Sequence, residues 1–209
     1  MLSDKGQLII ISAPSGTGKT SAIKSVIKRL NDNEIKSKFS VSHTTRQPRE
    51  GDIDGNDYFF VSDETFNELK NAGTFIETAE VHNNKYGTSK EFIDENINLG
   101  INIFLEIDVQ GFKQLKTKSV EFRSIFILPP SIDELSERIK KRGLDSEEVI
   151  KRRMTNALNE LSKAEEYDYL VINDVLDDAV QELLEIVTNK EFQDETHYKK
   201  IKILQDLLS

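Results

Sequence analysis

The chain has 209 residues, no cysteine and a formal net charge of −9, because 28 lysines and arginines stand against 37 aspartates and glutamates. This acidic balance argues against a protein that coats nucleic acid or an anionic membrane surface. The lack of cysteine excludes disulfides, thiolate catalysis and cysteine-ligated zinc. It also suits a reducing cytoplasm. Because the sequence has no signal-peptide pattern and no apolar run as long as a membrane span, we expect a soluble cytoplasmic protein.

The first predicted elements are a strand, a glycine-rich turn and a helix. Residues 8–11 are all apolar, which indicates a buried strand of a parallel sheet. Apolar residues then recur at helical spacing over residues 20–30. Three further segments rich in apolar residues, at 101–108, 124–128 and 169–172, predict the other buried strands.

Further helices are expected between and after these strands. Periodicity and capping residues place them at 63–71, 89–99, 131–142, 146–166 and 177–188. Ser62 or Asp63 would cap the first of these helices, and Gly100 would end the second. Strands that alternate with helices predict an α/β fold, in which helices cover both faces of a parallel sheet.

Two segments interrupt this predicted core. Residues 40–92 concentrate glycine, proline and charge, short runs such as 58–61 suggest antiparallel strands, and 75–81 reads as another strand. Residues 129–155 are helical and carry arginines. The predicted organisation is a core of 1–39, 93–128 and 156–190, inserts at 40–92 and 129–155, and a helical extension at 191–209.

The extension carries an apolar stripe at helical spacing, formed by Tyr198, Ile201, Leu204, Leu207 and Leu208. We expect this stripe to pack on the protein's own core. A contact between subunits is the alternative, so a monomer and a homodimer both remain open.

Residues 13–20 match the pattern of a phosphate-binding loop, G-x-x-x-x-G-K-[ST], except that alanine takes the place of the first glycine. The run is Ala13-Pro14-Ser15-Gly16-Thr17-Gly18-Lys19-Thr20. Small residues let backbone N–H groups surround a phosphate, and the following helix directs its positive end to the same place. Lys19 can reach the β and γ phosphates, and the Thr20 hydroxyl can bind Mg²⁺ directly. An ordinary tight turn with a surface lysine is the alternative, and Ala13 must adopt the loop's backbone angles without the freedom of glycine.

A second group of polar residues follows near residue 46. Arg46 and Arg49 flank a proline and can form a fork for one phosphate dianion, to which Tyr58 adds a neutral donor. Two arginines in a loop are more often solvated surface. Beside a phosphate loop, however, a kinase needs a site for the phosphate that accepts the transferred group.

Taken in order along the chain, these motifs resemble those of the guanylate kinases, over about residues 6–190. The resemblance rests on the phosphate loop, Ser42-x-Thr44-Thr45-Arg46-x-Pro48-Arg49, Asp57-Tyr58, Phe75-Ile76-Glu77, Tyr86-Gly87-Thr88, Glu106-Ile107-Asp108-Val109-Gln110-Gly111, Pro129-Pro130-Ser131, Arg138 to Gly143 and Val171-Ile172-Asn173-Asp174. It implies Mg²⁺-dependent, reversible phosphoryl transfer from ATP to GMP. It also implies a P-loop three-layer fold with a parallel sheet core, a β-rich GMP-binding insert at 40–92 and a helical lid at 129–155.

The same resemblance assigns the GMP site to Ser42, Arg46, Arg49, Tyr58, Glu77, Tyr86, Thr88 and Asp108. Glu77 would accept hydrogen bonds from the guanine N1–H and 2-amino group, and Thr88 would contact the base edge. Adenine presents no such pair of donors, so a buried Glu77 would stay unpaired with AMP. Without its neighbours, Glu77 would be interpreted as a carboxylate on a surface strand.

For the donor side, the resemblance implies that residues 13–20 bind ATP and that Asn173 contacts the adenine. The catalytic set would be Lys19, Arg46 and the lid arginines Arg138, Arg142 and Arg153. Which lid arginine touches the transferred phosphate stays open, and a solvated helix face with an ordinary Glu134–Arg138 pair is the plainer interpretation.

Glu106 and Asp108 are two apart on a predicted strand and would share a face. The resemblance gives Asp108 a contact with Mg²⁺ through water, and simple capping of the next turn is the alternative. ATP and GMP are the expected partners. Two other functions stay open at this point: a catalytically inactive guanylate-kinase-like module that binds protein partners, and a P-loop kinase with another acceptor.

Overall fold

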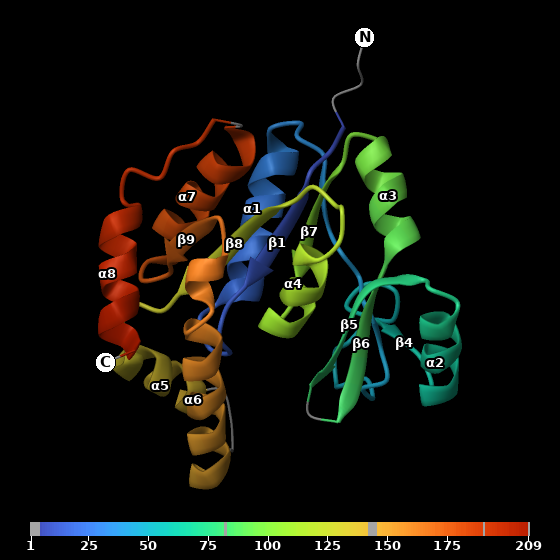
Figure 1. The fold of residues 1–209 in the computed structure, drawn as a ribbon, viewed down its shortest axis with the longest axis horizontal. Coiled ribbons are helices and arrows are strands. Elements are labelled where there is room, and N and C mark those ends of the chain that lie inside the picture. The colour runs from blue at the N-terminus through green and yellow to red at the C-terminus, as the bar shows by residue number, and fades with distance from the viewer. Residues whose placement is uncertain (1–4, 82, 142–145, 190, 209) are drawn as a thin grey trace. The chain divides into compact units, whose positions relative to one another are not determined.

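The structure is a computed structural model that describes residues 5–81, 83–141, 146–189 and 191–208. Its elements in chain order are β1 (Leu8–Ser12), α1 (Lys19–Asp32), β2 (Ser37–Phe39), β3 (His43–Thr44), β4 (Phe59–Phe60), α2 (Asp63–Asn71), β5 (Phe75–Val81), β6 (Asn84–Ser89), α3 (Lys90–Asn98), β7 (Asn102–Glu106), α4 (Val109–Lys116), β8 (Arg123–Leu128), α5 (Ile132–Lys141), α6 (Glu147–Leu161), a 3₁₀ turn η1 (Ala164–Glu166), β9 (Tyr169–Ile172), α7 (Leu176–Thr188) and α8 (His197–Leu208). Figure 1 labels most of them.

Two sheets organise the chain. The larger has the order β2-β7-β1-β8-β9, and the pairs β2–β7, β1–β8 and β8–β9 are all parallel. The smaller has the order β4-β3-β6-β5. The predicted α/β fold with a parallel sheet core is therefore confirmed.

By its internal contacts the chain divides into two compact units. The first unit is Met1–Leu8 with Lys36–Phe122, and the second unit is Ile9–Ile35 with Arg123–Ser209. The division predicted from the sequence, into core, two inserts and extension, stays a prediction.

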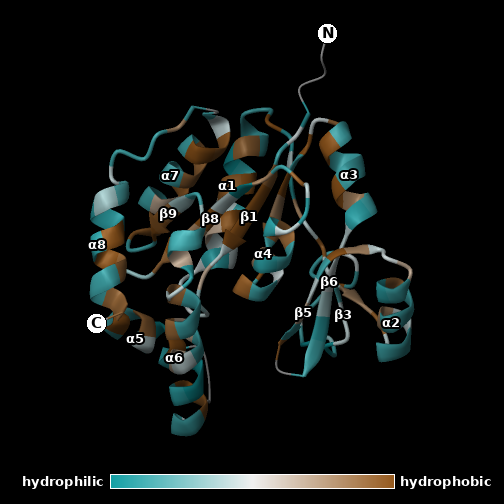
Figure 2. Cartoon of the chain, viewed as in Figure 1, coloured by the Kyte–Doolittle hydropathy of each residue, from teal (hydrophilic) through white to brown (hydrophobic). Residues whose placement is uncertain are grey.

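In the second unit, strands β1 and β8 are the apolar centre. Ile9, Ile10 and Ile11 are fully buried, as are Ile125 and Phe126. Figure 2 shows these strands as hydrophobic, whereas the helices are hydrophobic along one side only. Burial of apolar surface is the main term that favours folding, so these strands form the scaffold on which the loop after β1 is built.

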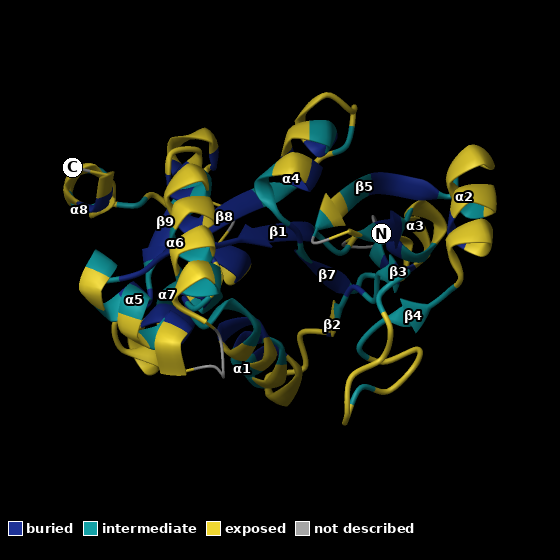
Figure 3. Ribbon diagram, turned by 90° about the horizontal axis from the view of Figure 1, so that it is seen from below, coloured by how far each residue is buried: buried dark blue, intermediate teal, exposed yellow. Residues whose placement is uncertain are grey.

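Helices lie on both faces of the strands in the second unit. Helix α1 buries Ala22, Ile23, Val26 and Leu30 and packs against α7, which in turn contacts β9. Helix α8 contacts β9 and α6, and Figure 3 shows it on the face opposite α7. Helices α5 and α6 pack together through Leu135, Ile139 and Ala157.

In the first unit, helices flank the smaller sheet and the strand β7. Helix α2 contacts β6, α3 contacts β7, and α4 contacts β5. Ser62 caps α2, since its hydroxyl accepts a hydrogen bond from the Thr65 N–H at 3.1 Å. Ser89 caps α3 in the same way, and Gly100 follows that helix with φ of 75°. The predicted cap of α2 and the predicted stop signal after α3 are therefore confirmed, whereas the Ser89 cap was not predicted.

Several expectations about the elements were wrong or incomplete. Strand β4 pairs with β3 in parallel, not antiparallel, because residues 45–58 form a long crossover between them and not a tight turn. The helix expected at 146–166 ends at Leu161 and is followed by the turn η1. Strands β2 and β6 and helix α4 were not predicted.

The C-terminal helix α8 packs on its own chain with part of the predicted stripe. Leu204 and Leu207 are buried, but Tyr198 is 83% exposed, so the five stripe residues do not share one buried face. Lys200 is buried on this helix, and its Nζ donates hydrogen bonds to Glu182 and, at 2.7 Å, to Asp194. Burial raises the pKa of the Glu182 carboxyl above its ordinary value, with the Lys200 hydrogen bond opposing this effect.

Within the described part of the chain, every helix is too short or too polar to cross a membrane.

Candidate functional site

The loop between β1 and α1 has the shape that phosphate binding requires. Gly16 and Gly18 adopt left-handed backbone conformations, with φ of 99° and 83°. Between them, Thr17 closes a turn, because its hydroxyl donates to the Pro14 carbonyl at 2.8 Å. A side chain at Gly18 would meet the Asn173 amide, with its Cβ only 2.6 Å from Nδ2. Glycine is therefore required at Gly18 for backbone conformation and for space.

Alanine at the first position of the motif is compatible with this loop. Among the described residues, the non-glycines with positive φ are Glu34 and Asn83. Ala13 therefore does not need the backbone freedom that glycine would provide at this position. The departure from the sequence pattern leaves the turn intact.

Helix α1 starts at Lys19, directly after Gly18, which takes the N-cap position without a side-chain cap. The first turn contains no acidic residue, so the positive end of the helix dipole is not neutralised by its own side chains. The Lys19 ammonium lies 3.5 Å from the Ala13 carbonyl, across the loop. Thr20, half-buried, is the second residue of the helix.

One of the three predicted lid arginines contacts this loop directly, and a second contacts Asn173, which binds the loop. Arg153 on α6 donates to the Ser15 hydroxyl at 2.8 Å. Arg138 on α5 donates to Glu134 at 2.8 Å and to the backbone carbonyl of Asn173 at 3.0 Å. Arg142 lies outside the described residues.

Asn173 connects the end of β9 to the phosphate loop. Its side chain is buried, and its amide nitrogen donates to the Thr17 carbonyl. Because its own carbonyl accepts from Arg138, Asn173 joins the loop to helix α5. Arg138 therefore forms the ordinary ion pair with Glu134 and also contacts Asn173 beside the loop.

In the first unit, Glu77 on β5 is the central residue of the predicted base site. The residue is only 3% exposed, so the alternative of a carboxylate on a surface strand is wrong. The Thr88 hydroxyl donates to Glu77 Oε1 at 2.5 Å, and the Ser42 hydroxyl lies 3.2 Å from the Thr88 hydroxyl. The structure therefore brings these three predicted residues together.

The pKa of the Glu77 carboxyl is raised to about 7, mainly because burial penalises the charged form. The Asp108 carboxylate also raises it, whereas the hydrogen bond from Thr88 and the charge of Lys118 lower it. A carboxylate with this pKa changes its ability to accept hydrogen bonds across the neutral range.

Arg46 already has a carboxylate partner in the structure. Its guanidinium pairs with Asp52 at 2.8 Å and lies over the ring of Tyr58, 5.2 Å from the centroid. The backbone N–H of Arg49 donates to the same Asp52 carboxylate at 2.7 Å. These two hydrogen bonds hold the pKa of Asp52 below its ordinary value. The Tyr58 ring meets Tyr86 at 5.8 Å, and burial raises the pKa of Tyr58 to about 12, so its hydroxyl stays a donor.

Asp108 lies beyond β7, which ends at Glu106, so the two residues do not share a strand as expected. Instead Asp108 caps helix α4 and accepts hydrogen bonds from the N–H groups of Gln110, at 3.0 Å, and Gly111, at 2.9 Å. The plainer interpretation of Asp108 as a cap is therefore confirmed, and its contact with a metal stays a prediction.

Four residues near the predicted site were given no role from the sequence: Asp52, Gly111, Gln114 and Lys118. Asp52 lies in a turn that its N–H closes on the Arg49 carbonyl, and no sequence pattern pairs its carboxylate with Arg46. Gly111 and Gln114 belong to α4, and only the contact of that helix with β5 reveals them.

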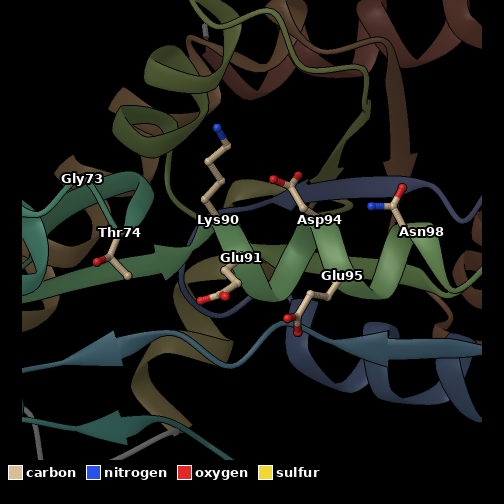
Figure 4. Close-up of a pocket in the computed structure, with 7 residues that line it drawn as sticks. All are labelled: Gly73, Thr74, Lys90, Glu91, Asp94, Glu95 and Asn98. Atoms are coloured by element: carbon tan, nitrogen blue, oxygen red, sulfur yellow. The ribbon is translucent and has the colours of Figure 1, made fainter.

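A surface pocket of about 460 Å³ lies over helix α3 in the first unit (Figure 4). It is lined by Gly73, Thr74, Lys90, Glu91, Asp94, Glu95 and Asn98. None of these is a predicted site residue, and their three carboxylates would repel a phosphate. The pocket therefore takes no part in the site described above.

Comparisons with known proteins agree with the predicted family. A family model described as guanylate kinase matches residues 5–190. A guanylate kinase of Escherichia coli (strain K12) is 49% identical over 185 residues, which are 88% of this chain and 87% of that protein. One from Hahella chejuensis (strain KCTC 2396) is 49% identical over 179 residues, 86% of this chain and 84% of that protein. The crystal structure of guanylate kinase from Anaplasma phagocytophilum has a TM-score of 0.71 at 30% identity and covers 97% of this chain and 95% of that one.

Proposed function

Because the chain belongs to the guanylate kinase family, we propose that residues 13–20 bind ATP and that the buried Glu77 recognises the guanine base of GMP. The enzyme is an ATP:GMP phosphotransferase, which converts ATP and GMP to ADP and GDP. The comparisons favour neither an inactive protein-binding module nor a kinase with another acceptor. The observation that supports the assignment of Glu77 most directly is its burial beside the hydroxyl of Thr88.

The reaction needs no general base, because the phosphate of GMP is already an anion that can attack the γ-phosphorus of ATP. Catalysis then consists of holding the two nucleotides in line and neutralising the negative charge between them. On the donor side we assign this work to Lys19 and to the lid arginines Arg138, Arg142 and Arg153. The contact of Arg153 with Ser15 supports its place beside the phosphates.

Asn173 supports the donor site in two ways. Its hydrogen bond to the Thr17 carbonyl keeps the loop against the end of β9. In the proposed site it also contacts the adenine of ATP, as the family resemblance implies.

The residues proposed for Mg²⁺ have the chemistry that this ion prefers. Mg²⁺ takes oxygen ligands, keeps several waters and usually binds one or two protein side chains together with substrate phosphates. Thr20 offers a hydroxyl in the first turn of α1, and Asp108 offers a carboxylate held by two N–H groups. We propose that Thr20 binds the ion directly and that Asp108 acts through water. The bound ion supplies positive charge to the phosphates during transfer.

The phosphate of GMP is assigned to Ser42, Arg46, Arg49, Tyr58 and Tyr86. The pair with Asp52 and the stacking on Tyr58 restrict the Arg46 side chain before any substrate binds. A restricted guanidinium loses less freedom when it takes up a phosphate.

We further propose that the enzyme works in the cytoplasm as a monomer or homodimer, with ATP and GMP as its partners and without nucleic acid or membrane. The net charge of −9 and the absence of cysteine support this.

The function is tested by measuring ADP release in the presence of ATP and Mg²⁺ with GMP, AMP, CMP and UMP offered separately. Turnover is expected with GMP and at most a trace with the other three, because only guanine presents two adjacent donors to Glu77. Equal turnover with AMP would contradict the assignment of the base site. No turnover with any of the four would contradict the acceptor assignment as a whole.

The KM for GMP is expected to rise as the pH falls below about 7, because protonation of Glu77 removes an acceptor that guanine needs. The limiting slope is roughly tenfold per pH unit for a single titrating group. The control is Glu77→Gln, which keeps the titration of the GMP phosphate near pH 6 and loses that of Glu77. Identical pH profiles for the two proteins would contradict the role of Glu77.

A further inference from the structure

Helix α4 and Lys118, which follows it, contact strand β5 on the two sides of Glu77. Strand β5 is the last strand in the order β4-β3-β6-β5, so one of its edges faces away from β6. There the Gln114 amide makes two hydrogen bonds with the backbone of Thr78. The Thr78 N–H donates to Gln114 Oε1 at 3.1 Å, and Gln114 Nε2 donates to the Thr78 carbonyl at 2.5 Å. The ammonium of Lys118 donates to the carbonyl of Ile76.

These bonds lie where the strand is irregular. The register between β5 and β6 shifts between Phe75 and Glu77, which makes Ile76 an extra residue in the strand. An extra residue of this kind is left out of the ladder and re-aims the side chains next to it. The direction of the Glu77 side chain therefore depends on a backbone bulge whose carbonyl is bound by Lys118.

The backbone of α4 also approaches the carboxylate itself. A Cβ built on Gly111 would lie 2.8 Å from Glu77 Oε2 and 3.4 Å from its Cδ, so only glycine fits between helix and carboxylate. On the other oxygen, Oε1, Glu77 accepts the Thr88 hydrogen bond. The carboxylate is thus fixed on one side by Thr88 and on the other by α4.

We propose that Gln114 and Lys118 are positioning residues that hold the bulge around Glu77 and so set the preference of the enzyme for guanine. This inference rests on the proposed role of Glu77. Two adjacent hydrogen bonds to one carboxylate require accurate placement, and a small displacement weakens the pair more than it weakens one bond. Inosine monophosphate separates the two cases, because hypoxanthine keeps the N1–H of guanine and lacks its 2-amino group.

The test compares Gln114→Met and Lys118→Met with Lys113→Met. Lys113 is exposed on the same helix, so the control replaces a long polar side chain by the same residue away from β5. For each variant, kcat and KM are measured with GMP and with inosine monophosphate, and KM with ATP. The assays are run near pH 8.5, where Glu77 is ionised and a changed pKa does not alter the result.

We expect Gln114→Met and Lys118→Met to raise the KM for GMP by about 3- to 10-fold, the loss expected for one weakened hydrogen bond. The kcat is expected to stay within about twofold, and the KM for ATP to stay unchanged. The ratio of kcat/KM for GMP to that for inosine monophosphate is expected to fall by about the same factor. If a substitution only weakened the packing of α4, activity with both acceptors would fall by the same factor, and the ratio would stay unchanged.

The Glu77→Gln variant distinguishes a failure of the positioning inference from a failure of guanine recognition by Glu77. If it lowers the ratio and both positioning variants keep the wild-type ratio, the inference is overturned while the function stands. If Glu77→Gln leaves the ratio unchanged, recognition by Glu77 is wrong and the inference fails with it. Thermal denaturation shows whether Gln114→Met folds. If it does not, Lys118→Met decides alone, because Lys118 lies beyond the last residue of α4 and is exposed.

Discussion

Lys19→Ala is expected to lower kcat by at least about 100-fold, the effect of removing one preorganised donor from a developing negative charge. Lys19 begins α1, and its ammonium lies across the loop near the Ala13 carbonyl. An alanine at this position keeps the helix, since alanine is the best helix former, and removes the ammonium with its contact to the Ala13 carbonyl. The loss should therefore appear in kcat and not in the stability of the fold.

The matched control is Lys24→Ala, because Lys24 is exposed on the same helix. Steady-state kinetics with saturating ATP and GMP, together with circular dichroism, measure both effects. Turnover in Lys19→Ala that equals that of the control would contradict the assignment of Lys19 to the phosphates.

Glu77→Gln is expected to lower kcat/KM for GMP by roughly 100-fold or more, because the amide offers one acceptor and one donor where guanine needs two acceptors. The same change is expected to stabilise the protein at pH 8. The pKa of Glu77 is raised from 4.5 to about 7 in the folded chain, so the folded state favours the proton. Stability is therefore lost as the pH rises from about 4.5 through 7, and glutamine avoids this loss.

The expected gain in the free energy of unfolding at pH 8 is on the order of 3 kcal/mol, because each tenfold difference in proton affinity between the folded and unfolded chain corresponds to about 1.4 kcal/mol. The gain should vanish near pH 4, where Glu77 is largely protonated in both states. Thermal or urea denaturation at the two pH values measures it. A variant that is no more stable than the wild type at pH 8 would show that burial does not penalise this carboxylate.

Features set by local sequence were predictable, and features set by distant contacts were not. The phosphate loop was predicted because an apolar strand, small residues and a helix follow one another within residues 8–30. Ser62 was predicted as a cap because its partner is three residues away. By contrast, Asp52 pairs with Arg46 through a loop whose path the sequence does not indicate.

Helix α4 was missed for a physical reason. Gly111 lies inside it and lowers its helix propensity by about 1 kcal/mol relative to alanine, and its short length leaves little apolar periodicity to detect. The glycine is explained by the close approach of Glu77 Oε2, a contact between residues far apart in sequence. The close contact with Glu77 thus requires glycine at a position where helix propensity alone would favour another residue.

The buried Lys200 restricts how the C-terminal helix can change during evolution. Its ammonium lies between Glu182 and Asp194, and it is 4% exposed. Replacing Lys200 alone leaves Glu182 and Asp194 without their cation, and replacing one carboxylate leaves the buried ammonium with one partner instead of two. Both changes are expected to be destabilising, whereas replacing all three by apolar residues of similar size is often neutral. Substitutions at these three positions are therefore coupled. Replacing the ionic cluster by apolar residues requires simultaneous changes in α7, in α8 and in the segment between them.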